Sequence, residues 1–336
     1  MNRVAAIIVN ANGGEHLDRA LTSLERQTVR PHRIIVVDNA STDGSADGIE
    51  RRHRGVEVVR SPENLGFAAG NNLAAYAADD CDWIALVNPD AFPEPRWLET
   101  LLAAAAAHPE YAFFGSRLVS ATNASVLDGT GDVFHVSGMA WRRDHGSRVV
   151  ARANEEIFSP CAAAALYRRD AFLEVGGFDE RFFCYFEDTD LAFRLRLAGY
   201  RCLYVDDAVC LHVGSASSGR TSDFTIYHSY RNQVWTFVKN MPATLLVLYV
   251  FQHVLVNLLT LAAYTVQGQG RVVLLAKWDA LRALPEVLRE RRAIQRARRV
   301  GARDLLRLMA RGPGGFARTF FQRFDVRGRR ARPRPA

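Results

Sequence analysis

Short apolar runs alternate with amphipathic stretches through the first third of the chain, and this alternation restricts the fold more than any other feature. The apolar runs, rich in Val and Ile, lie at residues 4–9, 33–37, 56–59 and 83–87. Helix-like patterns lie between or after them, at residues 15–26, 45–54, 66–78 and 95–107. This order predicts an α/β fold, Rossmann-like, in which helices flank a mostly parallel sheet.

Three of the four predicted strands run directly into polar segments. NANGG follows the first strand, DNASTDGS the second and NPD the fourth. In open α/β sheets, ligands bind beyond the carboxyl ends of the strands. We therefore expect the functional site at the edge of the sheet where these segments lie.

Asp38 ends the apolar run IIVVD and is followed by NASTDG, whose side chains can bond to nearby backbone or to a ligand. Its carboxylate is well placed for a nucleoside. An Asp that merely caps the turn explains the motif equally well, so both interpretations stay open.

The run ENLGFAAGNN, residues 63–72, places two Gly and three Asn around a predicted helix start. Free N–H groups and the helix dipole favour phosphate oxygens at such a position. Small residues also allow close packing, so the motif fits either a phosphate site or an ordinary helix start.

Two side chains that follow strands have the chemistry of ligands for a divalent ion. Asp90 closes WIALVNPD, and a carboxylate just past a buried strand is costly unless it is paired, solvated or metal-bound. His212 ends the run VCLH and offers a neutral imidazole nitrogen. A structural NPD turn and a packed His are the alternatives.

The densest group of carboxylates lies among aromatic residues in the stretch 178–200. Its acidic members are Asp179, Glu180, Glu187, Asp188 and Asp190. Apolar surroundings raise the pKa of a carboxylate and make it a better base. Acids also favour a helix start, and Asp190 can pair with Arg194 one turn later. We interpret Asp190 as structural and Asp188 as a catalytic base.

Taken in order, IIVNANG, VVDNASTDGS, ENLGFAAGNN, LVNPDAFPEP and GGFDERFFCYFEDTDLAFRLRLAGYR, followed by His212, resemble inverting glycosyltransferase family 2. Within the family they are similar to the rhamnosyltransferase-like branch of bacterial polysaccharide assembly. The resemblance covers residues 4–212 and implies the GT-A fold. It also implies transfer of a sugar from a nucleoside diphosphate with inversion at the anomeric carbon.

The resemblance implies roles for individual residues. Asp188, with Glu187 beside it, matches the catalytic carboxylate, while Asp90 and His212 match the ligands of Mg²⁺ or Mn²⁺. Arg231 and Asn232 resemble an Arg-Asn pair near the donor or acceptor. The residues expected to bind the donor are Val9, Asn10, Asn12, Asp38, Asn64, Gly66, Asn71, Asn88, Asp90 and Arg231.

The chain departs from the family pattern at two positions. Asn88 stands where a DxD-type metal motif has its first Asp, so metal dependence is expected to be weaker. Ala11 replaces a Tyr that usually lies against the nucleotide base. The resemblance favours dTDP-rhamnose as donor, with UDP-linked galactofuranose, glucose or N-acetylhexosamine as alternatives, and a lipid-linked or polysaccharide acceptor.

A 25-residue apolar segment, 242–266, is long enough to cross a bilayer, but Gln252, His253 and Asn257 interrupt it. These polar residues favour a helix that lies in the membrane interface over a full span. A buried core helix is the alternative. We expect a catalytic domain at 1–238, a helical membrane-associated region at 239–310 and a basic, disordered tail at 311–336.

Charge is divided unevenly along the chain. Residues 267–336 contain 19 Arg and Lys against 5 Asp and Glu, whereas residues 1–266 contain 24 basic and 31 acidic side chains. Basic residues next to an apolar helix predict an anionic membrane partner. With five widely spaced cysteines and no recognisable signal peptide, we expect the cytoplasmic face of the bacterial inner membrane.

Other functions fit the sequence less well. Nucleic-acid binding would explain the basic tail but not the acidic first part or the apolar helix. A nucleotidyltransferase would favour a Lys after the first strand, and NANGGEHL has none. A non-catalytic scaffold would have no need of Asp90, Asp188 and His212.

Overall fold

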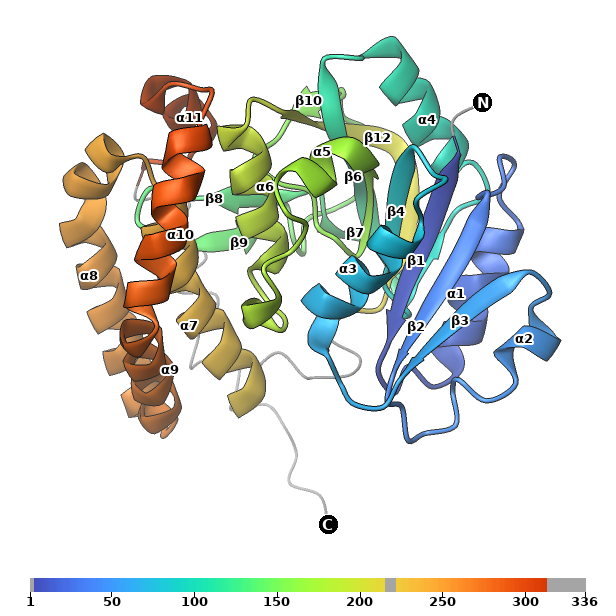
Figure 1. Ribbon diagram of the computed structural model, residues 1–336, viewed down its shortest axis with the longest axis horizontal. Helices are drawn as coiled ribbons and strands as arrows, with labels where there is room; N and C mark the ends of the chain where they lie inside the picture. Colours follow the sequence, from blue (N-terminus) through green and yellow to red (C-terminus); the bar gives the residue numbers. More distant parts are fainter. Residues whose placement is uncertain (1–2, 215–221, 313–336) are drawn as a thin grey trace.

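The computed structural model describes residues 3–214 and 222–312 (Figure 1). Most of the polar loop after His212 and nearly all of the expected disordered tail, 311–336, lie outside these residues. The strands are β1 (Val4–Asn10), β2 (Arg33–Asn39), β3 (Val56–Ser61), β4 (Trp83–Val87), β5 (Ala91–Pro93), β6 (Tyr111–Ser120), β7 (Asn123–Gly129), β8 (Asp132–Phe134), β9 (Ala140–Arg142), β10 (Glu155–Glu156), β11 (Ala164–Arg168) and β12 (Arg201–His212).

Helices flank these strands and form a separate layer at the C-terminal side (Figure 1). They are α1 (Glu15–Glu25), α2 (Ile49–Arg52), α3 (Gly66–Ala77), α4 (Trp97–Ala107), α5 (Arg169–Glu174), the 3₁₀ turn η1 (Glu180–Phe182), α6 (Glu187–Leu197), α7 (Asp223–Asn240), α8 (Ala243–Val266), α9 (Gly270–Arg282), α10 (Leu284–Ala297) and α11 (Ala302–Leu308).

One large mixed sheet forms the centre of the described residues. Its strands follow the order β10-β12-β6-β11-β4-β1-β2-β3, with β5 beside β12 and β7 beside β6. The four strands predicted from sequence are parallel neighbours, whereas β11 runs antiparallel between β4 and β6. The α/β fold class is confirmed, and the carboxyl ends of β1, β2 and β4 meet at one edge.

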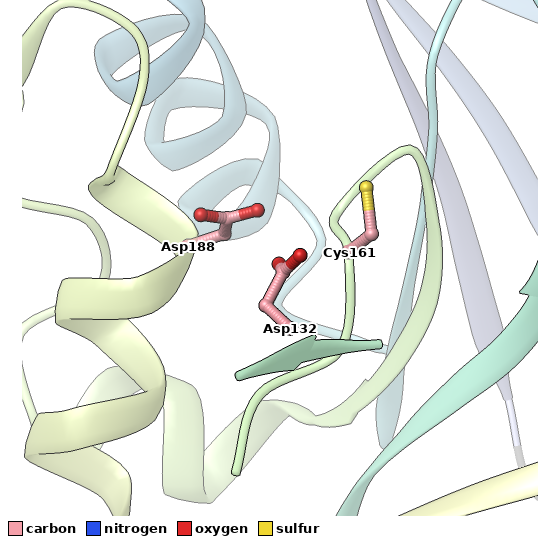
Figure 2. A group of neighbouring side chains, drawn as sticks. All are labelled: Asp132, Cys161 and Asp188. Atoms are coloured by element: carbon pink, nitrogen blue, oxygen red, sulfur yellow. The ribbon is translucent and has the colours of Figure 1, made fainter. Parts of the chain in front are cut away.

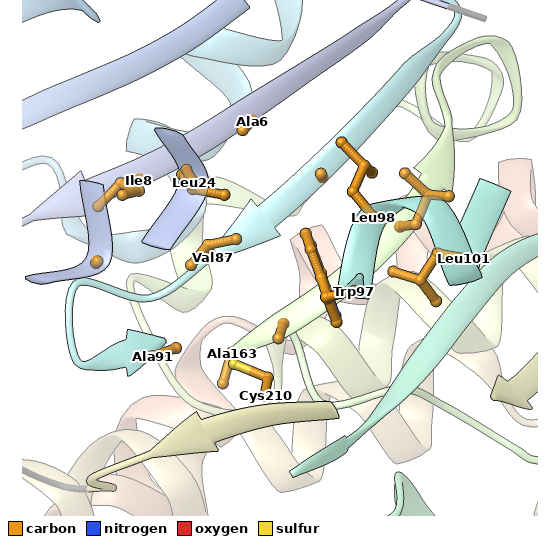
Figure 3. Close-up of a cluster of buried hydrophobic side chains, with 14 of the residues drawn as sticks. Ala6, Ile8, Leu24, Val87, Ala91, Trp97, Leu98, Leu101, Ala163 and Cys210 are labelled. Atoms are coloured by element: carbon orange, nitrogen blue, oxygen red, sulfur yellow. The ribbon is translucent and has the colours of Figure 1, made fainter. Parts of the chain in front are cut away.

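Both faces of the sheet are buried, as alternate residues of β1 show. Ala6 and Ile8 face α1 and α4, where Leu24 and Trp97 complete one core (Figure 3). Ile7 and the residues two positions before and after it face α3, α5 and α6 in a second core. A strand covered on both faces reads as a continuous apolar run, which is why the first strand is evident in the sequence.

The predicted helix at 45–54 is wrong in extent, since only Ile49–Arg52 is helical. Gly44 and Gly48 adopt positive φ angles of 76° and 63°. The carboxylate of Asp43 accepts hydrogen bonds from the backbone and hydroxyl of Ser45 at 3.0 and 2.6 Å. This local turn replaces the first half of the expected helix.

Helix α7 runs across the expected domain boundary at residue 238 and joins the two parts of the molecule. It packs against α6 of the sheet domain and against α9 and α10 of the C-terminal layer. Within the described residues, α8 alone is long and apolar enough to cross a membrane. Of an apolar stretch of 18 residues in this helix, 22% is buried.

Candidate active site

Asp90 and His212 lie together at the carboxyl edge of the sheet. The pairing of β5 with β12 sets His212 opposite Ala91, the residue that follows Asp90. As a result, His212 Nε2 lies 3.3 Å from Asp90 Oδ1, while Asp90 Oδ2 accepts a hydrogen bond from Gly214 N at 3.1 Å. Both side chains are buried.

Asp128, at the end of β7, orients the imidazole of His212 from the other side. His212 Nδ1 lies 2.7 Å from Asp128 Oδ2, which also accepts a hydrogen bond from Arg142. Burial alone would lower the pKa of His212, but the hydrogen bond to Asp128 and the nearby charge of Asp90 raise it above its usual value. A carboxylate behind the imidazole is the usual partner of a metal-binding His.

The Nε2 atom of His212 indicates whether the site formed with Asp90 suits a divalent ion. His212 Nε2 is buried and makes no hydrogen bond within the described residues, although it points towards Asp90. A cation between the imidazole and the carboxylate would satisfy both groups. Asp90 and His212 therefore fit the role of metal ligands.

A second group of polar side chains contains Asp188. It comprises Asp188 from the first turn of α6, Asp132 from β8 and Cys161 from the loop before β11 (Figure 2). One ligand atom from each lies within 4.8 Å of the others. Burial raises the pKa of Asp188, and burial together with the charge of Asp188 raises that of Asp132 well above its usual range. Asp188 thus has the raised proton affinity expected of a base.

Arg142, on β9, connects the two groups. Its guanidinium donates to Asp128 behind His212 and, through Nη2, to Cys161 Sγ at 3.1 Å beside Asp188. Asp128, Asp132 and Arg142 were not among the residues predicted from the sequence. The only local signal was DGTGD, in which two Asp flank a Gly-Thr-Gly turn.

The carboxyl group of Glu187 is buried next to Asp188. Its Oε2 makes no hydrogen bond within residues 3–214 and 222–312. Burial and the neighbouring charge of Asp188 raise the pKa of Glu187 well above its usual range, which favours the protonated form. In contrast, Asp190 pairs with Arg194 at 2.8 Å, as predicted from their spacing.

The loop before α6 holds three non-glycine residues at positive φ: Phe183 at 64°, Tyr185 at 66° and Phe186 at 69°. Asn232 Nδ2 donates to the carbonyl oxygens of residues 182, 184 and 185, at 2.8 to 3.0 Å. Arg231 Nη2 donates to those of residues 181 and 182. The Arg-Asn pair therefore supports the loop that carries Glu187 and Asp188; direct contact of Arg231 with a donor stays a prediction.

The residues expected at the nucleoside join two loops at the carboxyl edge. Asn10 Nδ2 donates to the hydroxyls of Ser41 and Ser45, each at 2.9 Å. Asn12 Oδ1 accepts from Thr42 N at 2.7 Å, and Asp38 Oδ1 accepts from Ser41 N at 3.2 Å. These bonds shape the loops around the expected nucleoside site, while contact with a nucleotide remains a prediction.

The helix-start motif makes contacts that serve packing. Asn64 Oδ1 accepts from Gly66 N at 2.9 Å, and Ala68 N donates to the carbonyl of Phe183 at 3.1 Å. A side chain at Gly66 would overlap Phe183, and one at Gly70 would reach Val9 Cγ1 at 2.8 Å. The close-packing alternative therefore explains both glycines.

Two expected donor-binding amides differ in their contacts. Asn71 Nδ2 donates to the carbonyl of Phe67 at 2.8 Å, within the same helix. In the NPD turn, Asn88 Oδ1 is buried and makes no hydrogen bond within the part of the chain that is described. Of the two, Asn88 has the oxygen that still needs a donor or a cation.

An α/β sheet with an Asp and a His at its carboxyl edge, joined through Arg142 to a buried Asp, is the arrangement expected of a transferase of the GT-A type. The comparison with family models agrees: residues 5–176 match the model for glycosyl transferase family 2. The chain belongs to this family and is an inverting hexosyltransferase.

Relatives and solved structures support the same assignment. The chain is 32% identical over 237 residues to the N-acetylglucosaminyl-diphospho-decaprenol L-rhamnosyltransferase of Mycobacterium tuberculosis, covering 64% of this chain and 77% of the relative. It is 26% identical over 199 residues to the O-antigen chain rhamnosyltransferase WbaN of Salmonella anatum, covering 56% and 59%.

Similar folds occur in two solved glycosyltransferases. The mannosyltransferase PcManGT of Pyrobaculum calidifontis, solved with GDP-Man and Mn²⁺, matches at TM-score 0.53 and 18% identity, over 96% of this chain and 82% of that one. GalNAc-T7, solved with UDP, GalNAc and Mn²⁺, matches at TM-score 0.57 and 15% identity. That match covers 70% of this chain and less than half, 47%, of GalNAc-T7, so it concerns the shared fold.

Proposed function

We propose that the protein transfers rhamnose from dTDP-rhamnose to a lipid-linked acceptor in the assembly of a bacterial cell-surface glycan. The observation that carries this proposal is the pair of groups joined by Arg142: Asp90 with His212 on one side and Asp188 on the other. Two relatives named as rhamnosyltransferases support the choice of sugar.

The residues have distinct tasks in this reaction. Asp188 takes the proton of the acceptor hydroxyl while that oxygen bonds to the anomeric carbon, and the bond from this carbon to the diphosphate breaks. Attack from the face opposite the diphosphate inverts the anomeric configuration. Asp132 lies beside Asp188 in the interior, and Asn232 holds the loop that carries the base.

Asp90 and His212 would hold Mg²⁺ or Mn²⁺, with Asp128 fixing the imidazole. Such an ion would supply positive charge to the departing diphosphate. The fit of the buried Nε2 of His212 supports this role, as does the presence of Mn²⁺ in two solved structures of the same fold.

A UDP-sugar donor is the second candidate. A relative named galactofuranosyltransferase GlfT1 of Mycobacterium tuberculosis is 29% identical over 221 residues. Ala11 stands where the family pattern has a Tyr, so the nucleotide base would lack the aromatic ring that usually lies against it. Galactofuranose, glucose or an N-acetylhexosamine then replaces rhamnose.

Calorimetric titration of the full chain in detergent with dTDP and with UDP, each with and without Mn²⁺, tests the proposal. We expect Mn²⁺-dependent binding of dTDP that Asp90→Ala abolishes. Asp188→Asn is the matched control and should bind dTDP like the wild type, because its carboxylate serves the acceptor. Tight binding of UDP alone would select the second candidate, and binding of neither nucleotide would contradict both.

A further inference from the structure

Helix α8 has the reverse of the polarity expected for a helix on a water-soluble protein. Its outward positions are apolar: Phe251 is 84% exposed and Val247 73%, and the same face continues through Leu255 and Leu258. Soluble proteins rarely leave such a continuous apolar stripe in contact with water.

The inward face of α8 carries buried polar residues. His253 Nδ1 lies 2.7 Å from the carbonyl oxygen of Ser137, and its ring stacks on Phe237 of α7 with centroids 3.9 Å apart. Thr260 and Tyr264 are buried further along the same face. Of the polar residues that interrupt the apolar segment in the sequence, His253 thus binds the rest of the protein.

Helix α9 presents a second apolar stripe on the same side of α7. Val273, Ala276 and Ala280 are buried inward, whereas Leu274, Leu275, Trp278 and Leu281 are exposed. Both α8 and α9 contact α7 with their buried faces. Figure 1 shows both helices on the side of α7 that lies away from the sheet.

The exposed charges of α9 are basic, while its Lys277 points inward to the carbonyl oxygen of Tyr230. On α9, Arg271 and Arg282 are exposed at the two ends of the apolar stripe. The acidic residues point the other way, since Asp279 accepts from Tyr227 at 2.7 Å and Glu290 of α10 pairs with Arg181. The outer surface therefore combines apolar side chains with positive charge, which complements an anionic lipid surface.

Building on the lipid-linked acceptor of the proposed function, we propose that α8 and α9 dock side by side in the interface of an anionic bilayer and that α8 does not cross it. The inward face of α8 is packed from Leu245, beside α7, to Tyr264, beside Tyr230. A spanning α8 would have to detach from α7, which leaves His253 and Thr260 in hydrocarbon, or take α7 and its buried Lys239 with it.

Flotation of the full chain with vesicles tests the docking face. We expect binding to vesicles that contain phosphatidylglycerol, retained in high salt, where charge attraction by the basic tail is screened. Phe251→Glu combined with Trp278→Glu should lower the bound fraction about tenfold or more, because two apolar side chains no longer enter the interface. Val150→Glu, an exposed apolar residue in the sheet domain, is the matched control.

Depth measurements distinguish a docked helix from a spanning one. Cysteines introduced at Val247, Leu255 and Val266 would each carry an NBD fluorophore, quenched by lipids that are labelled at known depths. A docked helix gives three similar, shallow depths. A label on Leu255 at the bilayer centre, with the two ends at opposite surfaces, would overturn the proposal.

Two further readouts complete the test. Nucleotide binding by the Glu variants should equal that of the wild type, so that a failure of docking is separated from a failure of the proposed function. If the wild type does not float but forms dimers that the Glu variants disrupt, the face is a contact between copies of the chain and the proposal is wrong.

Discussion

At the scale of single residues, the site is built from carboxylates that lie next to His212 and next to Asp188. Asp90 faces His212 Nε2 and Asp128 faces its Nδ1, so the imidazole is held from both sides. Asp132 lies beside Asp188 in a region where burial raises the pKa of both. Asp128 and Asp132 therefore influence the two residues for which we propose direct roles, His212 and Asp188.

Asp128→Asn should weaken Mn²⁺ binding about 10- to 100-fold, because the imidazole loses the negatively charged acceptor that orients it. Mn²⁺ titration followed by electron paramagnetic resonance measures this affinity. Asp207→Asn, an exposed Asp on the same strand as His212, is the control and should leave Mn²⁺ affinity unchanged. Unchanged affinity in Asp128→Asn would show that His212 is not a ligand.

Asp188→Asn should lower kcat about 10²- to 10⁴-fold, the usual loss when a catalytic base is removed. A base works when deprotonated, so the raised pKa of Asp188 means that kcat/KM falls as the pH drops through a value above the usual Asp range. Burial and the charge of Asp188 raise the pKa of Asp132 well above its usual range, which favours the protonated form of Asp132.

The pH profile of Asp132→Asn tests whether Asp132 is protonated while Asp188 acts as the base. Because a neutral amide resembles a protonated carboxyl group, the acid limb of kcat/KM should keep its position in this variant. A limb that moves to lower pH would show instead that Asp132 is charged during the reaction.

At the scale of elements, α7 determines the shape of the loop that precedes α6. Three positive φ angles in non-glycine residues are costly unless surrounding structure holds them. Asn232 and Arg231 provide that support through carbonyl oxygens of residues 181–185. The helix thus supports the loop that leads to Asp188, the proposed base.

Asn232→Ala should reduce kcat roughly 10-fold or more while nucleotide affinity stays near that of the wild type, since about three hydrogen bonds that hold the loop are lost. Steady-state kinetics and nucleotide titration measure the two effects. Ile226→Val trims the same helix where it packs against Tyr264 and Val273 instead of the loop, and should leave kcat unchanged. Equal losses of kcat and of nucleotide affinity in Asn232→Ala would contradict a positioning role.

At the scale of the whole molecule, buried charges join the sheet domain to the C-terminal helices. Lys239 Nζ lies 2.6 Å from Asp179 and 2.9 Å from Asp190, and Arg181 joins Asp179 to Glu290 of α10. Removing one partner from such a network leaves an unpaired buried charge, which is strongly destabilising. This network therefore joins α7 and α10 to the segment that leads into α6.

The sequence by itself determined the features that depend on local pattern. The strands at 4–9, 33–37 and 83–87 were evident because a strand buried on both faces is an unbroken apolar run. Asp90, Asp188 and His212 could be singled out because each lies close to the start or the end of a recognisable helix or strand. The pairing of Asp190 with Arg194 followed from helical spacing.

Only the tertiary structure decided which residues meet. Asp128 lies 84 residues before His212, and Asn232 lies 50 residues after Phe182, so no local pattern could associate them. Packing likewise decided which face of α8 points inward. His253 lies on the inward face because its ring stacks on α7 and its Nδ1 lies beside the carbonyl oxygen of Ser137. Periodicity reports which side of an element is apolar, whereas the contacts across the chain determine what that side faces.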